Sequence, residues 1–346
     1  MKKTVAILFG GCSSEYDVSL VSATAVIKSV NKEKYNVLMI GITRDGDFYL
    51  YEGDIDNIEK DEWFQKDLVK RITISTNRKD HGIILLETNE VIKIDIAFPV
   101  LHGRNGEDGR LQGLLELAGI KYVGCDMTSS ALCMDKYLAH EIVSLNGFLS
   151  PVSYLFCEKD SYEIIANKVR NLTYPLFVKP LKAGSSFGIT KIARIEELNG
   201  ALKEAFVYDN KVIIEENVDG FEVGCAVLGN DESIISEVDE IELEDGFFDY
   251  FEKYNLKTSN IHLPARLSTK EREKIKETAL SIYKILGCSG FARVDMFYTK
   301  DKRIVFNEVN TIPGCTSHSR YPSMLKEIGI SFEEVIDRLI TLGWER

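Results

Sequence analysis

Short apolar runs and amphipathic helical patterns alternate along the first third of the chain. Residues 4–9, 36–42 and 94–100 are rich in valine and isoleucine, and the segments between or after them carry apolar side chains at helical spacing. Strands that alternate with helices indicate a parallel sheet with helices on its faces. The pattern therefore predicts an N-terminal α/β domain over residues 1–124.

The rest of the chain divides into two further units. Residues 129–145 have helical spacing, and a short strand (176–179) then leads into a turn rich in glycine and serine. Hairpin-like strands follow, together with a helix whose start is marked by a capping box at 268–271. We predict a central subdomain over 125–215 and a C-terminal subdomain over 216–346, in a mixed α/β fold.

Composition narrows the class of protein. A chain of 346 residues is too long for one ordinary core, and its net charge of −12 argues against a nucleic-acid partner. No apolar run approaches the roughly 20 residues that span a bilayer, so membrane insertion is not expected. The seven cysteines are scattered and predict neither disulfides nor a zinc site. We therefore expect a cytoplasmic protein.

Two strands near the C-terminus carry polar side chains where a core face is expected. In 291–297, Arg293 and Asp295 share a face, and strict alternation places Glu308 and Asn310 on one face with residues 304 and 306. An isolated buried carboxylate is costly, and Mg²⁺ would compensate it. The alternative is a solvated strand end before the next turn, and alternation alone does not decide between them.

Motifs along the whole chain add to this pattern. Together with residues 290–295 and 307–314, they resemble the D-alanine–D-alanine ligases of the ATP-grasp superfamily. The motifs are Phe9–Glu15, His102–Gly109, Met134–Lys136, Lys179–Pro180, Gly184–Gly188 and Thr316–Ser319.

The resemblance implies three domains, with ATP held between the two ATP-grasp subdomains. It assigns Asp295, Glu308 and Asn310 to two Mg²⁺ ions, for which Mn²⁺ could substitute. It assigns Arg293 and the Gly314 backbone N–H to the hole that stabilises developing oxygen charge.

The resemblance also assigns residues to ATP. Lys136 and Lys179 match phosphate-binding lysines, and residues 184–188, with Ser185 and Ser186, match a loop that covers the phosphates. The segment is not a Walker loop, because no G-x-x-x-x-G-K-[ST] occurs. Glu215, Glu222 and Phe297 complete the expected ATP site. The alternative for each lysine or glutamate is an exposed surface residue, and Asn217 departs from the tryptophan of several relatives.

The first substrate is expected on the N-terminal domain. Gly10–Gly11 lacks the spacing of a dinucleotide-binding fingerprint. By resemblance, Glu15 holds the ammonium group of D-alanine, linked through Tyr254 and Ser185, and His102 lies beside the substrate carboxylate. The alternatives are a helix-capping acid for Glu15 and a structural role for His102.

Residues around the second substrate decide the product. The segment 246–254 resembles a loop over the active site, and its Lys253 and Tyr254 favour an amine nucleophile over D-lactate. Arg320 stands where ordinary D-Ala–D-Ala ligases have leucine, and a guanidinium suits a hydroxymethyl group. With Phe248, Asp239 and Ser319, it completes the expected substrate pocket.

This pocket resembles that of the vancomycin-resistance D-alanine–D-serine ligases, the G type in particular. We therefore predict a D-Ala–D-Ser ligase, with a housekeeping D-Ala–D-Ala ligase as the alternative. The family further implies a homodimer. A nicotinamide-dependent dehydrogenase would leave Asp295, Glu308 and Asn310 without a role. A non-catalytic ATP-binding module could have lost Arg293 or the metal-binding acids, which this chain retains.

Overall fold

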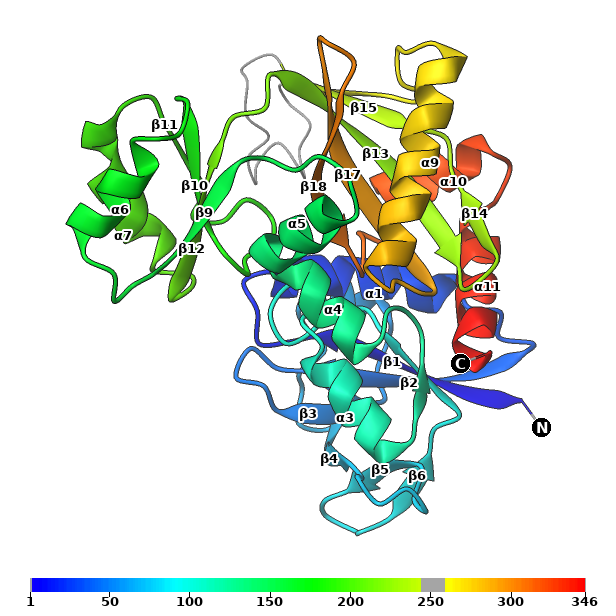
Figure 1. Ribbon diagram of the computed structural model, residues 1–346. Coiled ribbons are helices and arrows are strands. Elements are labelled where there is room, and N and C mark those ends of the chain that lie inside the picture. Colours follow the sequence, from blue (N-terminus) through cyan, green and yellow to red (C-terminus); the bar gives the residue numbers. More distant parts are fainter. Residues whose placement is uncertain (1, 244–258, 346) are drawn as a thin grey trace.

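Three sheets organise the computed structural model, which describes residues 2–243 and 259–345 (Figure 1). The N-terminal sheet has the strand order β6-β5-β4-β3-β2-β1-β7-β8. The strands β2, β1, β7 and β8 pair in parallel, as predicted, and β3 to β6 extend the sheet by antiparallel pairing. The strands are β1 (Lys3–Gly10), β2 (Tyr35–Ile42), β3 (Phe48–Tyr51), β4 (Val69–Ile74), β5 (Gly82–Leu85), β6 (Val91–Lys93), β7 (Ile96–Pro99) and β8 (Lys121–Tyr122).

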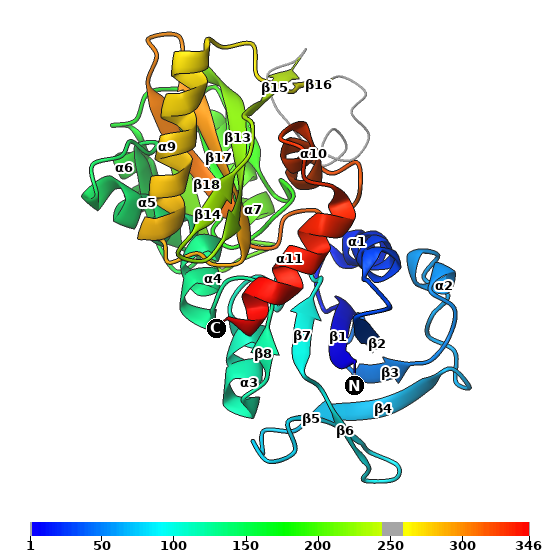
Figure 2. The same ribbon diagram turned by 90° about the vertical axis from the view of Figure 1, so that its right-hand side faces the viewer.

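Helices cover both faces of this sheet, which is why β1 is apolar at nearly every position. On one face, Ile7 and Phe9 pack with Leu20 of α1 (Tyr16–Ser29), beside the short α2 (Asp56–Glu59). The last helix, α11 (Phe332–Trp344), joins the same core (Figure 2). On the other face, Leu8 packs with Leu115 of α3 (Arg110–Ala118). The two ends of the chain therefore share one core.

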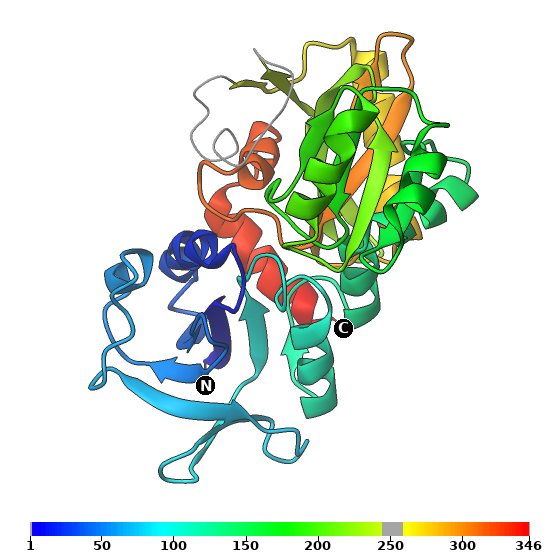
Figure 3. The same cartoon turned by 90° about the vertical axis from the view of Figure 1, so that its left-hand side faces the viewer.

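The central subdomain is a small sheet with its own core. Its antiparallel strands have the order β11-β10-β12-β9, and α6 and α7 pack with them (Figure 3). The bounds are β9 (Ser153–Cys157), α6 (Tyr162–Val169), β10 (Leu176–Pro180), β11 (Thr190–Ile192), the 3₁₀ turn η1 (Ile195–Glu197), α7 (Leu198–Ala205) and β12 (Lys211–Glu216).

The C-terminal sheet carries most of the predicted chemistry. Its strand order is β16-β15-β13-β17-β18, with β14 paired to β13, and α9 packs against its buried face. The capping box predicted at 268–271 is present at the start of α9. The elements are β13 (Gly220–Gly229), β14 (Ser233–Ile235), β15 (Asp239–Leu243), β16 (Ser259–His262), α9 (Thr269–Ile285), β17 (Phe291–Thr299), β18 (Ile304–Asn310) and α10 (Arg320–Glu327).

One part of the predicted domain division differs from the packing. Helices α4 (Met127–Met134) and α5 (Lys136–Leu145) were expected in the central subdomain, but Cys133 of α4 and Ala139 and Val143 of α5 share a core with β13, β17 and α9. Their sequence gives helical spacing but not the identity of the sheet that they cover. No helix among the described residues is long and apolar enough to cross a membrane.

Candidate active site

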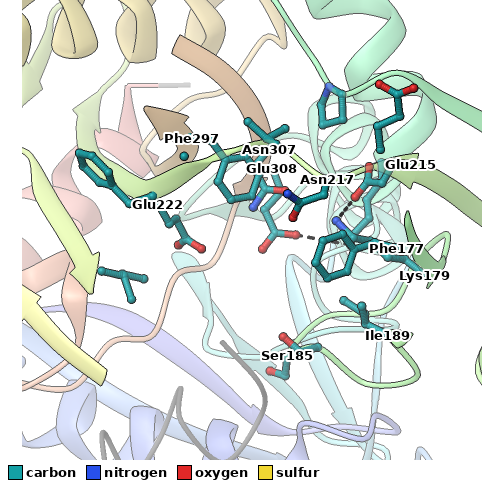
Figure 4. Close-up of a pocket in the computed structure, with 18 of the residues that line it drawn as sticks. Phe177, Lys179, Ser185, Ile189, Glu215, Asn217, Glu222, Phe297, Asn307 and Glu308 are labelled. Carbon is teal, nitrogen blue, oxygen red and sulfur yellow. Dashed lines mark ion pairs between the residues drawn. The ribbon is translucent and has the colours of Figure 1, made fainter. Parts of the chain in front are cut away.

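A cleft of about 370 Å³ lies between the central and C-terminal sheets (Figure 4). Phe177 lines it from the central sheet and Phe297 from the C-terminal sheet, so two aromatic side chains border the space between the two sheets. Polar groups from both sheets complete its lining, among them Lys136, Lys179, Ser185, Ser186, Glu215, Asn217, Glu222 and Glu308. The structure thus brings together every residue that the sequence assigned to ATP.

A buried ion pair lies in the wall of this cleft. Lys179 of β10 pairs with Glu215 of β12, whose side chain is only 2% exposed. The buried ring of His140 on α5 lies beside this pair, with its Nδ1 3.9 Å from Glu215 Oε2 and its Nε2 2.8 Å from the Asn307 carbonyl oxygen. Burial lowers the pKa of His140 to about 4. The ring is therefore neutral near pH 7 and donates its Nε2–H to that carbonyl.

A second cavity, of about 330 Å³, lies between the N-terminal domain and the C-terminal sheet. It is lined from the N-terminal side by Glu15 and His102, and from the C-terminal side by Arg293, Asn310, Gly314, Ser319 and Arg320. Residues at its boundary with the first cleft line both spaces: Lys136, Ala183, Gly184, Ser185 and Glu308. Groups bound in the two spaces would therefore meet beside Lys136 and Glu308, whose Nζ and Oε2 atoms are 3.5 Å apart.

The polar face of β18 arises from a bulge that the sequence analysis missed. Asp295 pairs with Glu308, but the next residue, Met296, pairs with Phe306, so Asn307 is an extra residue in β18. The predicted common face for 304, 306, 308 and 310 is therefore wrong. Phe306 packs in the core with Met296, whereas Glu308 lies opposite Asp295. The bulge therefore moves Glu308 away from the core face of β18 and onto the face that carries Asp295.

Asp295 is the most enclosed acid of the expected metal set, with 1% of its surface exposed. Its carboxylate accepts hydrogen bonds from Arg293 at 2.7 and 2.8 Å and from the Asn310 amide at 2.8 Å. Arg320 Nη2 lies 3.6 Å from it. These groups compensate a charge that burial alone would make costly.

The donor set fits Mg²⁺. Among the described residues, no group of three or more His, Cys, Asp or Glu side chains gathers around a possible metal position. The expected metal set consists instead of two carboxylates, Asp295 and Glu308, and one amide, Asn310. Mg²⁺ is typically bound through one or two carboxylates together with substrate phosphates, and the shared boundary of the two cavities leaves room for phosphates.

Glu15 is not a helix cap. It occupies the N-cap position of α1, but its side chain makes no capping hydrogen bond. Instead it is 6% exposed and accepts a hydrogen bond from the Ser185 hydroxyl, which comes from the loop between β10 and β11. Ser185 and Ser186 have φ values of 49° and 60°. Such left-handed backbone is unfavourable for serine and is typical of functional loops.

Arg320 is held by acids on three sides. It begins α10, and its guanidinium donates to both oxygens of Asp239, at 2.7 and 2.8 Å, and to Glu222 at 2.8 Å. Burial opposes its charge, but Asp239, Asp295 and Glu222 outweigh burial and raise its pKa well above the usual value. A Cβ at Gly224 would lie 2.7 Å from Arg320 Nη2 and 2.9 Å from an oxygen of Asp239. The glycine therefore makes room for this cluster.

Both nitrogens of His102 are occupied in the structure. Nδ1 is 3.1 Å from the Ile312 carbonyl oxygen, and Nε2 is 3.1 Å from the Ser22 hydroxyl. Ser319 closes a turn, because its hydroxyl accepts from the backbone N–H of Thr316 at 3.1 Å. The other expected substrate residues, Phe248, Lys253 and Tyr254, lie outside the described residues.

The sequence analysis missed two site residues, the partly exposed Glu107 and the buried His140. Glu107 accepts hydrogen bonds from Gly103 N–H at 2.8 Å and from Ile312 N–H at 3.1 Å. Burial, and secondarily the charge of Glu15, raise its pKa to about 8. Glu107 lies within the motif His102–Gly109, and that motif was a sequence signal for it. No sequence signal marked His140, because a histidine on a helical apolar stripe is usual in a core.

Comparisons with known proteins cover the whole chain. A model of the D-ala D-ala ligase N-terminus matches residues 4–125, and one of the D-ala D-ala ligase C-terminus matches 152–341. The crystal structure of the VanG D-Ala:D-Ser ligase from Enterococcus faecalis is 54% identical, with a TM-score of 0.92, over 99% of this chain and 100% of that chain.

Curated relatives extend this similarity to other members. The vancomycin B-type resistance protein VanB from Enterococcus faecalis is 46% identical, over 100% of this chain and 99% of its own length. A D-alanine–D-alanine ligase from Caldicellulosiruptor bescii is 45% identical, over 100% of this chain and 96% of its own length. The relatives therefore differ in their stated specificity.

Glu107 makes the stability of the ligand-free protein depend on pH. Its pKa is raised from 4.5 to about 8, so the folded chain keeps a proton that the unfolded chain releases in this interval. This contribution to the free energy of unfolding is fully present below pH 4.5 and is lost as the pH rises to about 8. Denaturant unfolding across this interval should show a flatter pH dependence for Glu107→Gln than for wild type. Asp108→Asn is the control, and an unchanged slope in Glu107→Gln would contradict the expectation.

Proposed function

Because the chain belongs to the D-alanine–D-alanine ligase family, we propose that it joins D-alanine to D-serine for peptidoglycan precursors. Its membership makes it an ATP-dependent ligase that forms a peptide bond. The observation that supports the reaction course best is the shared boundary of the two cavities. A nucleotide in one cavity and a carboxylate in the other would meet at Lys136, Ser185 and Glu308.

The first step forms an acyl phosphate. Glu15 holds the ammonium group of D-alanine and so turns its carboxylate toward the boundary of the nucleotide cleft. Lys136 and Lys179 hold the phosphates, and one carboxylate oxygen attacks the γ-phosphorus while ADP leaves. Asp295, Glu308 and Asn310 would hold Mg²⁺, which neutralises charge on the transferring phosphoryl group.

The second step forms the peptide bond. The amine of the second amino acid attacks the acyl carbon, and phosphate leaves with the carboxylate oxygen that it acquired and with the proton that the amine loses. Arg293 and the Gly314 N–H stabilise the negative oxygen of the tetrahedral intermediate, and both line the cavity. Exclusion of water protects the acyl phosphate from hydrolysis.

Arg320 and Asp239 select D-serine. Their bidentate pair places charged hydrogen-bonding groups where ordinary members of the family have a leucine side chain. A site of this kind favours a hydroxymethyl group over a methyl group, because only the hydroxyl can hydrogen-bond to these charged side chains. The 54% identity to a protein described as a D-Ala:D-Ser ligase supports this choice. The 45% identity to a D-alanine–D-alanine ligase keeps the housekeeping activity as the alternative.

Competition between equal concentrations of D-serine and D-alanine tests the specificity directly. With D-alanine as first substrate, D-Ala–D-Ser should be the main product by mass spectrometry. A higher kcat/KM for D-alanine than for D-serine at neutral pH would contradict the assignment.

Variants of the Arg320–Asp239 ion pair test whether these two residues determine the preference for D-serine. Arg320→Leu alone leaves the buried Asp239 without its main cation, which is strongly destabilising. The double variant Arg320→Leu/Asp239→Asn avoids this charge and should lower the ratio of kcat/KM for D-serine over D-alanine by roughly tenfold or more. Arg320→Lys keeps the charge but loses the bidentate contact, and should give an intermediate ratio. An unchanged ratio in the double variant would assign selectivity elsewhere.

Nucleotide turnover tests the order of the reaction. ADP release should require both amino acids, since the acyl phosphate needs D-alanine to form and an amine to be consumed. The measurement is ADP formation with no amino acid, with D-alanine alone and with both. Substantial ATP hydrolysis without any amino acid would count against this cycle.

A further inference from the structure

We propose that Glu107 and His102 form a clamp that positions the Ile312–Gly314 turn for the second chemical step. Both are positioning residues in this account, since they act through the backbone of Ile312. The proposal rests on the proposed role of the Gly314 N–H at the tetrahedral intermediate.

The clamp takes both polar backbone atoms of one residue. Glu107 accepts from Ile312 N–H at 3.1 Å, and His102 Nδ1 lies 3.1 Å from the Ile312 carbonyl oxygen. The other oxygen of Glu107 accepts from Gly103 N–H at 2.8 Å, so the carboxyl group also fixes the shape of its own loop. A short loop of the N-terminal domain thus hydrogen-bonds to the backbone of a segment that lies about 200 residues later in the chain.

The hydrogen-bond pattern fixes the tautomer of His102. A carbonyl oxygen only accepts, so Nδ1 carries the hydrogen that is donated to Ile312. Nε2 then accepts from the Ser22 hydroxyl of α1, at 3.1 Å. Burial lowers the pKa of His102 to about 4, so the ring is neutral at physiological pH. A neutral ring that makes hydrogen bonds through both nitrogens is suited to hold the Ile312 backbone in place.

The turn needs such support because the sheet ends before it. The last residue of β18 is Asn310, and its pairing with Arg293 is the last pair of the ladder. Ile312 lies beyond that pair and is only 4% exposed, so its backbone groups need partners within the protein. Gly314 follows two residues later and lines the same cavity as Arg293. A displacement of about 1 Å at an oxyanion-binding group can cost on the order of a hundredfold in rate.

Glu107→Gln changes the clamp without removing its volume. Glutamine keeps one acceptor oxygen, but its amide N–H₂ meets one of the two backbone N–H donors. Single-turnover rapid-quench experiments with ATP, D-alanine and D-serine separate the steps, because ADP reports the first and the dipeptide reports the second. We expect ADP formation within about threefold of wild type and dipeptide formation slower by roughly tenfold to a hundredfold.

Two matched comparisons make this result specific. Asp108→Asn alters the next residue of the same loop, which bonds only to Asn105 and Arg110, and should leave both rates unchanged. At position 102, asparagine can place its amide nitrogen where Nδ1 lies, whereas glutamine reaches the position of Nε2. His102→Asn should therefore slow dipeptide formation less than His102→Gln.

The outcomes separate the clamp from the proposed function. Equal slowing of ADP and dipeptide formation in Glu107→Gln, or no slowing of either, would overturn the clamp. If Glu107→Gln does not fold, the two His102 variants decide, and equal rates in them would overturn it as well. A wild-type enzyme that forms neither ADP nor dipeptide would instead contradict the proposed function.

Discussion

The buried carboxylate of Asp295 is the constraint on which the rest of the site depends. With 1% exposure it requires compensation, and Arg293 of β17 and Arg320 of α10 supply positive charge while Asn310 of β18 donates a hydrogen bond. Arg293, Asn310 and Arg320 also line the second cavity, so electrostatics set their positions there before any ligand binds. Gly224 makes this arrangement possible, because a side chain there would occupy the space of the Arg320 guanidinium.

The three sheets explain why the reaction is confined to one place. The central and C-terminal sheets line the first cleft, and the N-terminal domain closes a second cavity against the C-terminal sheet. The two spaces share a boundary at Lys136, Ser185 and Glu308, where a transferable phosphoryl group and a carboxylate can approach. Each of the two spaces is therefore lined by two parts of the chain, and no single domain forms the candidate site alone.

Much of this was predictable from the sequence, within clear physical limits. The α/β alternation, the helix at the capping box and the family followed from local pattern and motif order. The prediction of side-chain faces from strict alternation failed at Asn307, because a bulge is not visible in a pattern of apolar and polar residues. Glu107 and His140 were missed because each acts through contacts with backbone from distant segments, Ile312 and Asn307. The packing of α4 and α5 on the C-terminal sheet is likewise a long-range property.

In the proposed reaction, a carboxylate is activated as an acyl phosphate beside Lys136, Ser185 and Glu308. Oxygen transfer tests it most directly. D-alanine labelled with ¹⁸O in its carboxylate is incubated with ATP and the second amino acid, and the released phosphate is analysed by mass spectrometry. Each phosphate formed with a dipeptide should carry one ¹⁸O from D-alanine. Phosphate without the label, formed alongside the dipeptide, would contradict it.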